Sequence, residues 1–178
     1  MKKDIDWFIQ KGLLVKTPFI TKLSTKFLEK AENNLITLSI LFDLHTDENV
    51  RNALHVPEDY DSSEWVVACA YYAMYMAASA ALAKIRYRCK NHTATVLALE
   101  TFFVKKQLLE ETYLKMIEKA QLEKHYIDNL NLARDRREIA QYSVTKETTR
   151  RIAEVIKEDA YTFVQRMQKL VADLERYE

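Results

Sequence analysis

The side chains best suited to bind or act on a ligand lie close together, in the run Arg134-Asp135-Arg136-Arg137 and at Tyr142. A guanidinium group can form two parallel hydrogen bonds to a phosphate, and an aromatic ring beside it can stack on a base. Arg134, Arg136 and Arg137 are therefore candidates for binding RNA or nucleotide phosphate. The alternative is a solvated helix end, where arginines interact favourably with the helix dipole.

Metal and cofactor sites are not indicated by the remaining chemistry-bearing residues. The four histidines are isolated, and none belongs to a Glu-x-x-His pair of the kind that holds iron in helical bundles. Cys69 and Cys89 are 20 residues apart and form no Cys-x-x-Cys motif, which favours two reduced thiols in a cytoplasmic protein. A single glycine, Gly12, excludes a glycine-rich nucleotide loop. We expect no metal and no cofactor.

The elements that must position these residues are expected to be helices. The chain of 178 residues has one glycine and two prolines, too few turn-forming residues for a sandwich or a barrel. Apolar residues make up 48% of it, enough to bury one core. We predict an all-α, up-and-down bundle (residues 20–178) with a short helical N-terminal extension (residues 1–19). Apolar residues at steps of three and four predict five main helices, over residues 20–44, 63–90, 93–106, 109–142 and 146–176.

One segment is long enough to cross a membrane, because residues 65–83 carry no charge. Eight of these 19 residues are alanine, and three tyrosines lie in the middle of the segment rather than at its ends. This composition favours a helix buried at the centre of the bundle over a membrane span. The formal net charge of +1 also argues against binding of nucleic acid or membrane by bulk charge. The N-terminus does not read as a signal peptide, so a cytoplasmic location is expected.

Four segments resemble the small HEPN-domain proteins. Residues 70–78, AYYAMYMAA, are similar to the AYYAMFHAA segment of that family, and residues 91–96, NHTATV, fall where its members often read THSGV. Residues 102–105, FFVK, and residues 137–142, REIAQY, resemble the FVK and R-x-x-A-D-Y elements. The order and approximate spacing agree over residues 22–175.

The resemblance implies a helical bundle that is often dimeric. Catalytic HEPN proteins cleave RNA without a metal, using an arginine and a histidine separated by four to six residues. Many stand-alone members pair with a minimal nucleotidyltransferase as toxin and antitoxin. This chain departs from the catalytic pattern, since no histidine follows Arg137 within that window. Arg86 and His92 match the spacing but lie at the end of the alanine-rich segment, outside the family's position for the motif.

The leading functional expectation is therefore a non-catalytic or weakly catalytic HEPN-like module of a defence or toxin–antitoxin system. It would contact a partner protein and, through the arginines, RNA or nucleotide phosphate. The first alternative is a metal-independent endoribonuclease in which Arg137 stabilises the scissile phosphate and Tyr142 lies in the site. The second alternative is a purely structural interaction bundle. His92 would join the site only if the end of the alanine-rich helix packs beside the end of the charged one. We also expect a homodimer with both arginine clusters on the same side.

Overall fold

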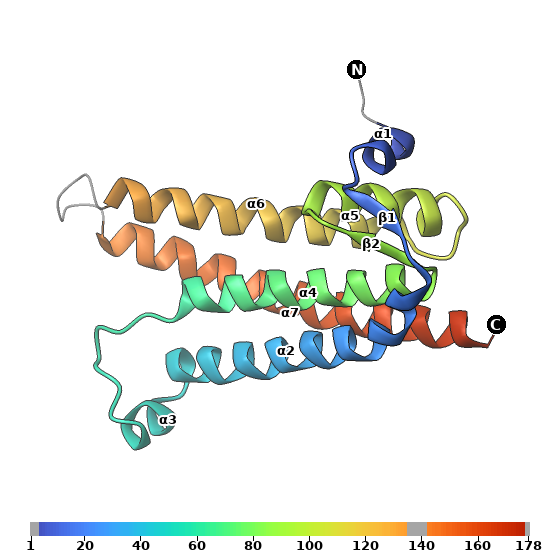
Figure 1. Ribbon diagram of the computed structural model, residues 1–178. Coiled ribbons are helices and arrows are strands. Elements are labelled where there is room, and N and C mark those ends of the chain that lie inside the picture. The colour runs from blue at the N-terminus through green and yellow to red at the C-terminus, as the bar shows by residue number, and fades with distance from the viewer. Residues whose placement is uncertain (1–3, 135–141, 177–178) are drawn as a thin grey trace.

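The computed structural model describes residues 4–134 and 142–176, except for the side chains of residues 45, 126–134 and 142–148. Helices account for 79% of the structure, and a two-stranded sheet is its only other regular element within the described ranges (Figure 1). The expected all-α class is thus confirmed. The elements in chain order are α1 (Ile5–Gln10), β1 (Leu14–Lys16), η1 (Pro18–Leu23), α2 (Ser24–Thr46), α3 (Glu48–Ala53), α4 (Ser63–Lys84), β2 (Tyr87–Cys89), α5 (His92–Leu99), η2 (Glu100–Val104), α6 (Glu111–Arg134) and α7 (Tyr142–Glu175).

The alanine-rich helix α4 lies at the centre of the bundle. It packs against α2, α6 and α7, and these four long helices run in alternating directions (Figure 1). Its alanines at steps of three and four are fully buried, and their small side chains let the neighbouring helices approach closely. At the closest approach to α2, the Ser24 hydroxyl donates a hydrogen bond of 2.9 Å to the carbonyl oxygen of Ala80. By length and composition alone α4 could span a membrane, but 61% of its most apolar window is buried inside the protein.

The N-terminal residues are joined to the bundle more closely than the term extension suggests. Strand β1 pairs antiparallel with β2, with Leu14 opposite Cys89 and Lys16 opposite Tyr87. The side chains of Phe8 and Leu14 are only 3% and 1% exposed and belong to the main core. Residues 4–16 therefore contribute core side chains and a strand.

The helix expected over residues 63–90 ends at Lys84 instead. Arg86 turns the chain with a φ of 69°, a left-handed conformation that is uncommon for residues other than glycine. The next three residues then form β2. The reason is a long-range one, because the hydrogen-bonding partner of β2 lies some 70 residues earlier in the chain, at 14–16.

The remaining helices follow the sequence signals with shifted ends. Asn91 caps α5 by accepting a hydrogen bond of 2.8 Å from the Ala94 amide, as its residue type predicts. Residues 45–63, which read as a loop with room for one short helical turn, contain the short helix α3. The charged helix is described as far as Arg134, and its expected end at residue 142 lies beyond residues 135–141, which are outside the described residues. The last helix already includes Tyr142, four residues before its expected start.

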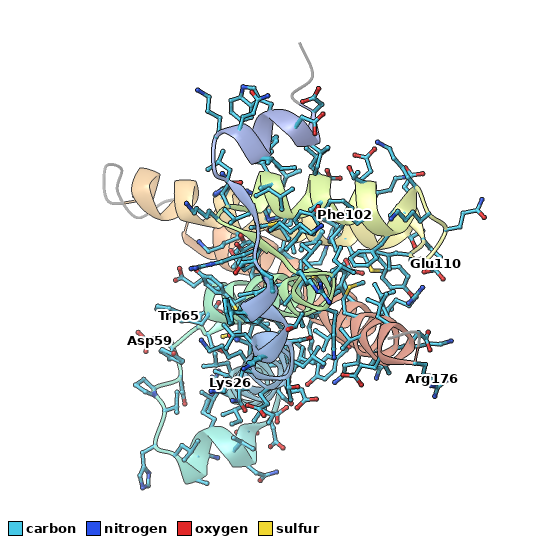
Figure 2. All side chains as sticks on the ribbon, turned by 45° about the vertical axis from the view of Figure 1, so that its right-hand side comes forward. Lys26, Asp59, Trp65, Phe102, Glu110 and Arg176 are labelled. Atoms are coloured by element: carbon cyan, nitrogen blue, oxygen red, sulfur yellow. The ribbon has the colours of Figure 1, made fainter. Side chains whose placement is uncertain are left out.

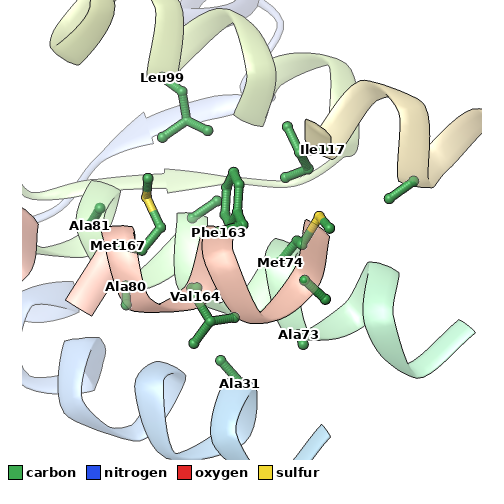
Figure 3. Close-up of a cluster of buried hydrophobic side chains, with 14 of the residues drawn as sticks. Ala31, Ala73, Met74, Ala80, Ala81, Leu99, Ile117, Phe163, Val164 and Met167 are labelled. Atoms are coloured by element: carbon green, nitrogen blue, oxygen red, sulfur yellow. The ribbon is translucent and has the colours of Figure 1, made fainter. Parts of the chain in front are cut away.

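The hydrophobic core includes side chains of α7 and of the helices packed around it. Phe163 and Met167 of α7 lie among Met74 of α4, Leu99 of α5 and Ile117 of α6 (Figure 3). Each of these five side chains is fully buried. The core therefore joins α4, α5, α6 and α7, and it fixes the helices from which the candidate site residues extend.

Candidate phosphate site and the Tyr71–His92 pair

The arginine cluster falls at the join between the two C-terminal helices. Arg134 is the last residue of α6, and Tyr142 is the first residue of α7. Arg136 and Arg137 lie outside the described residues, as do the side chains of Arg134 and Tyr142. The structure therefore defines the two helix ends that flank the cluster but not the arrangement of its side chains.

Both helices that lead to the cluster are held by contacts with other elements. Lys119 of α6 forms an ion pair of 3.0 Å with Asp159 of α7. Arg150 of α7 forms one of 3.3 Å with Asp61, which precedes α4. Ile117 and Ile156, one from each helix, are fully buried. These contacts hold the described parts of α6 and α7 against the rest of the bundle.

His92 lies in a different part of the molecule, at the first turn of α5 and beside α4. Its Nδ1 atom is 3.5 Å from the hydroxyl oxygen of Tyr71, and the two ring centroids are 5.7 Å apart. The Tyr71 ring also stacks on Tyr75 at 6.1 Å. The Nε2 atom of His92 is buried and has no hydrogen-bond partner among the described residues. The structure thus pairs His92 with a tyrosine.

The surroundings keep both members of this pair uncharged near neutral pH. Burial, together with the charge of His125, lowers the pKa of His92 to about 4. Burial, with the neighbouring Tyr75 and Tyr72, raises the pKa of Tyr71 to about 12. A neutral imidazole can accept a proton, but a pKa this low makes it a poor base at pH 7. The neutral tyrosine hydroxyl can donate or accept a hydrogen bond, but it keeps its proton near pH 7.

No described contact joins His92 to the arginine cluster. The α6 residue whose charge reaches His92 is His125, nine positions before Arg134. At 1.5 Å per residue, the end of α6 is about 13 Å further along the helix axis. The end of α4 and the end of α6 also lie toward opposite ends of the bundle (Figure 1). Tyr71 and His92 are 21 positions apart, so no local spacing could have indicated that they pair.

The structure describes most of the residues that could bind a metal, and it describes both cysteines. Within residues 4–134 and 142–176, no three histidine, cysteine or acidic side chains form a group that could hold a metal ion. Both cysteines are free. Burial raises the pKa of Cys69 and raises that of Cys89 to about 11, so the unreactive thiol form prevails near neutral pH.

The depressed pKa of His92 predicts a loss of stability in acid. Its pKa is about 4 in the folded protein and about 6.5 in an unfolded chain, so between these values the unfolded state binds the extra proton. The contribution of His92 is therefore present above pH 6.5 and is lost as the pH falls toward 4. Relative to His92→Gln, wild type should lose about 1 kcal/mol of unfolding free energy between pH 7 and pH 5, a value reduced for partial solvation of the ring.

Urea unfolding of both proteins at the two pH values measures this difference, and the carboxylates common to both cancel. Parallel pH dependences for wild type and His92→Gln would show that His92 titrates normally in the folded state.

Comparisons of this chain with protein-family models, with curated proteins and with solved structures find no match.

Proposed function

We propose that this protein is a HEPN-like helical module that binds RNA or nucleotide phosphate through Arg134, Arg136 and Arg137 without efficient catalysis. The observation that supports it most is the density of the run, three arginines within four residues, in the part of the chain between the described parts of α6 and α7. A guanidinium group forms paired hydrogen bonds to phosphate oxygens, so such a run suits an anionic ligand. The proposal that the module is HEPN-like rests on the four segments that resemble HEPN proteins.

The lack of a suitable base favours binding over cleavage. Metal-independent cleavage of RNA needs a group that accepts the proton of the 2′-hydroxyl and a cation that stabilises the phosphorane charge. Arg137 can supply the cation. Tyr142 has a reference pKa of about 10, too high for an efficient base at pH 7. His92 is paired with Tyr71, and its pKa of about 4 is too low.

The proposed setting is a defence or toxin–antitoxin system. In it the protein forms a homodimer and contacts a partner protein, for which the resemblance suggests a minimal nucleotidyltransferase. The protein would act in the cytoplasm. These assignments rest on the resemblance to HEPN proteins.

Substitution of Arg137 tests the proposal. Arg137→Ala should weaken binding of a fluorescently labelled RNA by about 1–3 kcal/mol, or about 5- to 150-fold, because a charged hydrogen bond to phosphate is removed. Arg151→Ala is the matched control, since Arg151 is an exposed arginine of α7. It should change the affinity little, and so should His92→Ala. Fluorescence anisotropy measures all four proteins.

Two results would contradict the proposal. Efficient RNA cleavage by wild type in the presence of a chelator, abolished by Arg137→Ala, would make the protein an endoribonuclease. Absence of RNA and nucleotide binding by the wild type would favour the structural interaction module.

A further inference from the structure

A second basic surface is created where two stretches without acidic residues meet. Residues 7–28 and residues 65–99 contain no aspartate or glutamate. The pairing of β1 with β2 brings these two stretches together. Together they contain eight of the 27 basic residues and none of the 26 acidic residues. The rest of the chain therefore has 19 basic and 26 acidic residues. The small net charge of the protein therefore conceals a strongly uneven distribution. The eight are Lys11, Lys16, Lys22, Lys26, Lys84, Arg86, Arg88 and Lys90.

Most of these cations are exposed and available. Lys84 is partly buried and pairs with Glu175 at 2.6 Å, but the other seven are exposed and form no ion pair with any described residue. Figure 2 faces this side of the molecule, where the chain descends from α1 through β1 and η1 to Lys26. We refer to these seven residues as the ribbon surface.

The strand pair holds part of the ribbon surface in a regular row. Arg88 lies opposite Val15, and the Lys90 amide donates a hydrogen bond of 2.9 Å to the Leu13 carbonyl. Residues two apart on a strand point to the same face and are about 6.7 Å apart. Arg88 and Lys90 therefore point outward together, and the exposed Arg86 precedes them. This row resembles the repeat of phosphates along an extended single strand of nucleic acid.

Aromatic side chains accompany the cations. Phe19 of η1 is 78% exposed. The Tyr87 ring stacks on Phe102 with centroids 4.4 Å apart, and the Lys16 ammonium lies 6.0 Å from the Tyr87 centroid. Aromatic faces among basic side chains are typical of surfaces that bind single-stranded nucleic acid.

A groove next to the row has room for one ring. It lies between α4, α2 and β2 and has a volume of about 150 Å³, and a cavity of about that size accepts benzene. Its lining is mostly apolar and aromatic, and the exposed Arg88 borders it. The lining residues are Ile20, Phe27, Tyr75, Met76, Ser79, Leu82, Tyr87, Arg88 and Cys89.

We propose that the ribbon surface binds single-stranded RNA, with phosphates along Arg86, Arg88 and Lys90 and one pyrimidine ring in the adjacent groove. The groove favours RNA over an anionic membrane, because a lipid headgroup offers no aromatic ring. This surface lies at the end of α4 that is remote from the α6–α7 join (Figure 1), so it is separate from the arginine cluster of the proposed function.

Charge reversal on the ribbon tests the inference with the full chain. The probe is a fluorescently labelled oligouridylate of about 12 nucleotides, within the range of single-strand binding sites. R88E/K90E should raise the Kd by about tenfold or more. R151E/K169E is the matched control: it changes the net charge equally at two exposed positions of α7, and it should leave the Kd within about twofold. Circular dichroism verifies that each variant is folded.

The salt dependence of binding is a second measurement, and it needs only neutral substitutions instead of charge reversal. With R88Q/K90Q, the slope of log Kd against log salt should fall by about 1.4, or about 0.7 for each phosphate that is no longer neutralised. Equal weakening by both charge-reversal pairs, or weakening by neither, would overturn the inference. So would binding to phosphatidylserine vesicles without binding to the oligouridylate, or competition by polyglutamate as strong as that by unlabelled oligouridylate.

The proposed function can fail separately from this inference. Loss of binding in Arg137→Ala alone would leave the arginine cluster as the RNA site and remove the ribbon surface. Loss in R88E/K90E alone would have the opposite meaning. Loss in both variants would indicate one RNA that contacts both surfaces, in support of both proposals.

Discussion

Replacement of Phe163 by alanine should lower the free energy of unfolding by about 3–5 kcal/mol, the usual cost of emptying a fully buried phenylalanine site. Phe163 is 0% exposed, and its ring makes an edge contact with Tyr113 of α6 at 6.3 Å between centroids. Its neighbours come from three other helices (Figure 3), which cannot all move to fill the cavity. Urea unfolding followed by circular dichroism at 222 nm measures the change.

Phe19→Ala is the matched control for this prediction. Phe19 is 78% exposed, so the same truncation removes little buried surface. We expect a change of about 0.5 kcal/mol or less. Equal losses for the two variants would contradict the burial of Phe163 and, with it, the packing of α7 against α4 and α6.

The helical fold was predictable because its signals are local. The scarcity of glycine and proline excludes most turns of a sheet protein, and the alanines of the central segment recur at helical spacing. The cap at Asn91 was also predictable, because asparagine commonly accepts a hydrogen bond from the third residue of a helix.

The pairing of the two strands could not be predicted from local patterns, although one local signal for β2 was present. Residues 85–90, IRYRCK, alternate apolar and basic side chains, which favours a half-buried strand, whereas the alanine-rich helix was expected to continue to residue 90. Their conformation depends on backbone hydrogen bonds with residues 14–16, which were expected to belong to a separate helical extension. The turn at Arg86 was not predictable either, because a φ of 69° usually falls on glycine and no glycine is present there.

Parts of the candidate site were also predictable from local sequence, and parts were not. The run from Arg134 to Arg137 is a local signal of the sequence. The pairing of His92 with Tyr71 and the ribbon surface depend on contacts between distant segments. The net charge of +1 hides this surface, because it is made by two stretches that meet only in the folded protein.

Close packing of α4 should make its alanines intolerant of larger side chains. We expect A73L/A80L to lower the free energy of unfolding by about 2–6 kcal/mol, because overpacking costs about 1–3 kcal/mol at each of two well-separated positions. Both alanines are 0% exposed. Displacement of α2 from α4 would also break the hydrogen bond from Ser24 to the Ala80 carbonyl, now 2.9 Å long.

The control pair A53L/A172L introduces the same side chains at exposed positions of α3 and α7. It should change the free energy of unfolding by less than about 1 kcal/mol, since exposed substitutions usually cost within about 0.5 kcal/mol each. Thermal unfolding compares the two pairs, and about 2–4 °C per kcal/mol is expected for a chain of this length. If A73L/A80L unfolded at the same temperature as its control, the small residues of α4 would not determine the spacing between the helices. The close approach of α2 would then have to depend on its larger apolar side chains, such as Leu35 and Leu38, which belong to the same core.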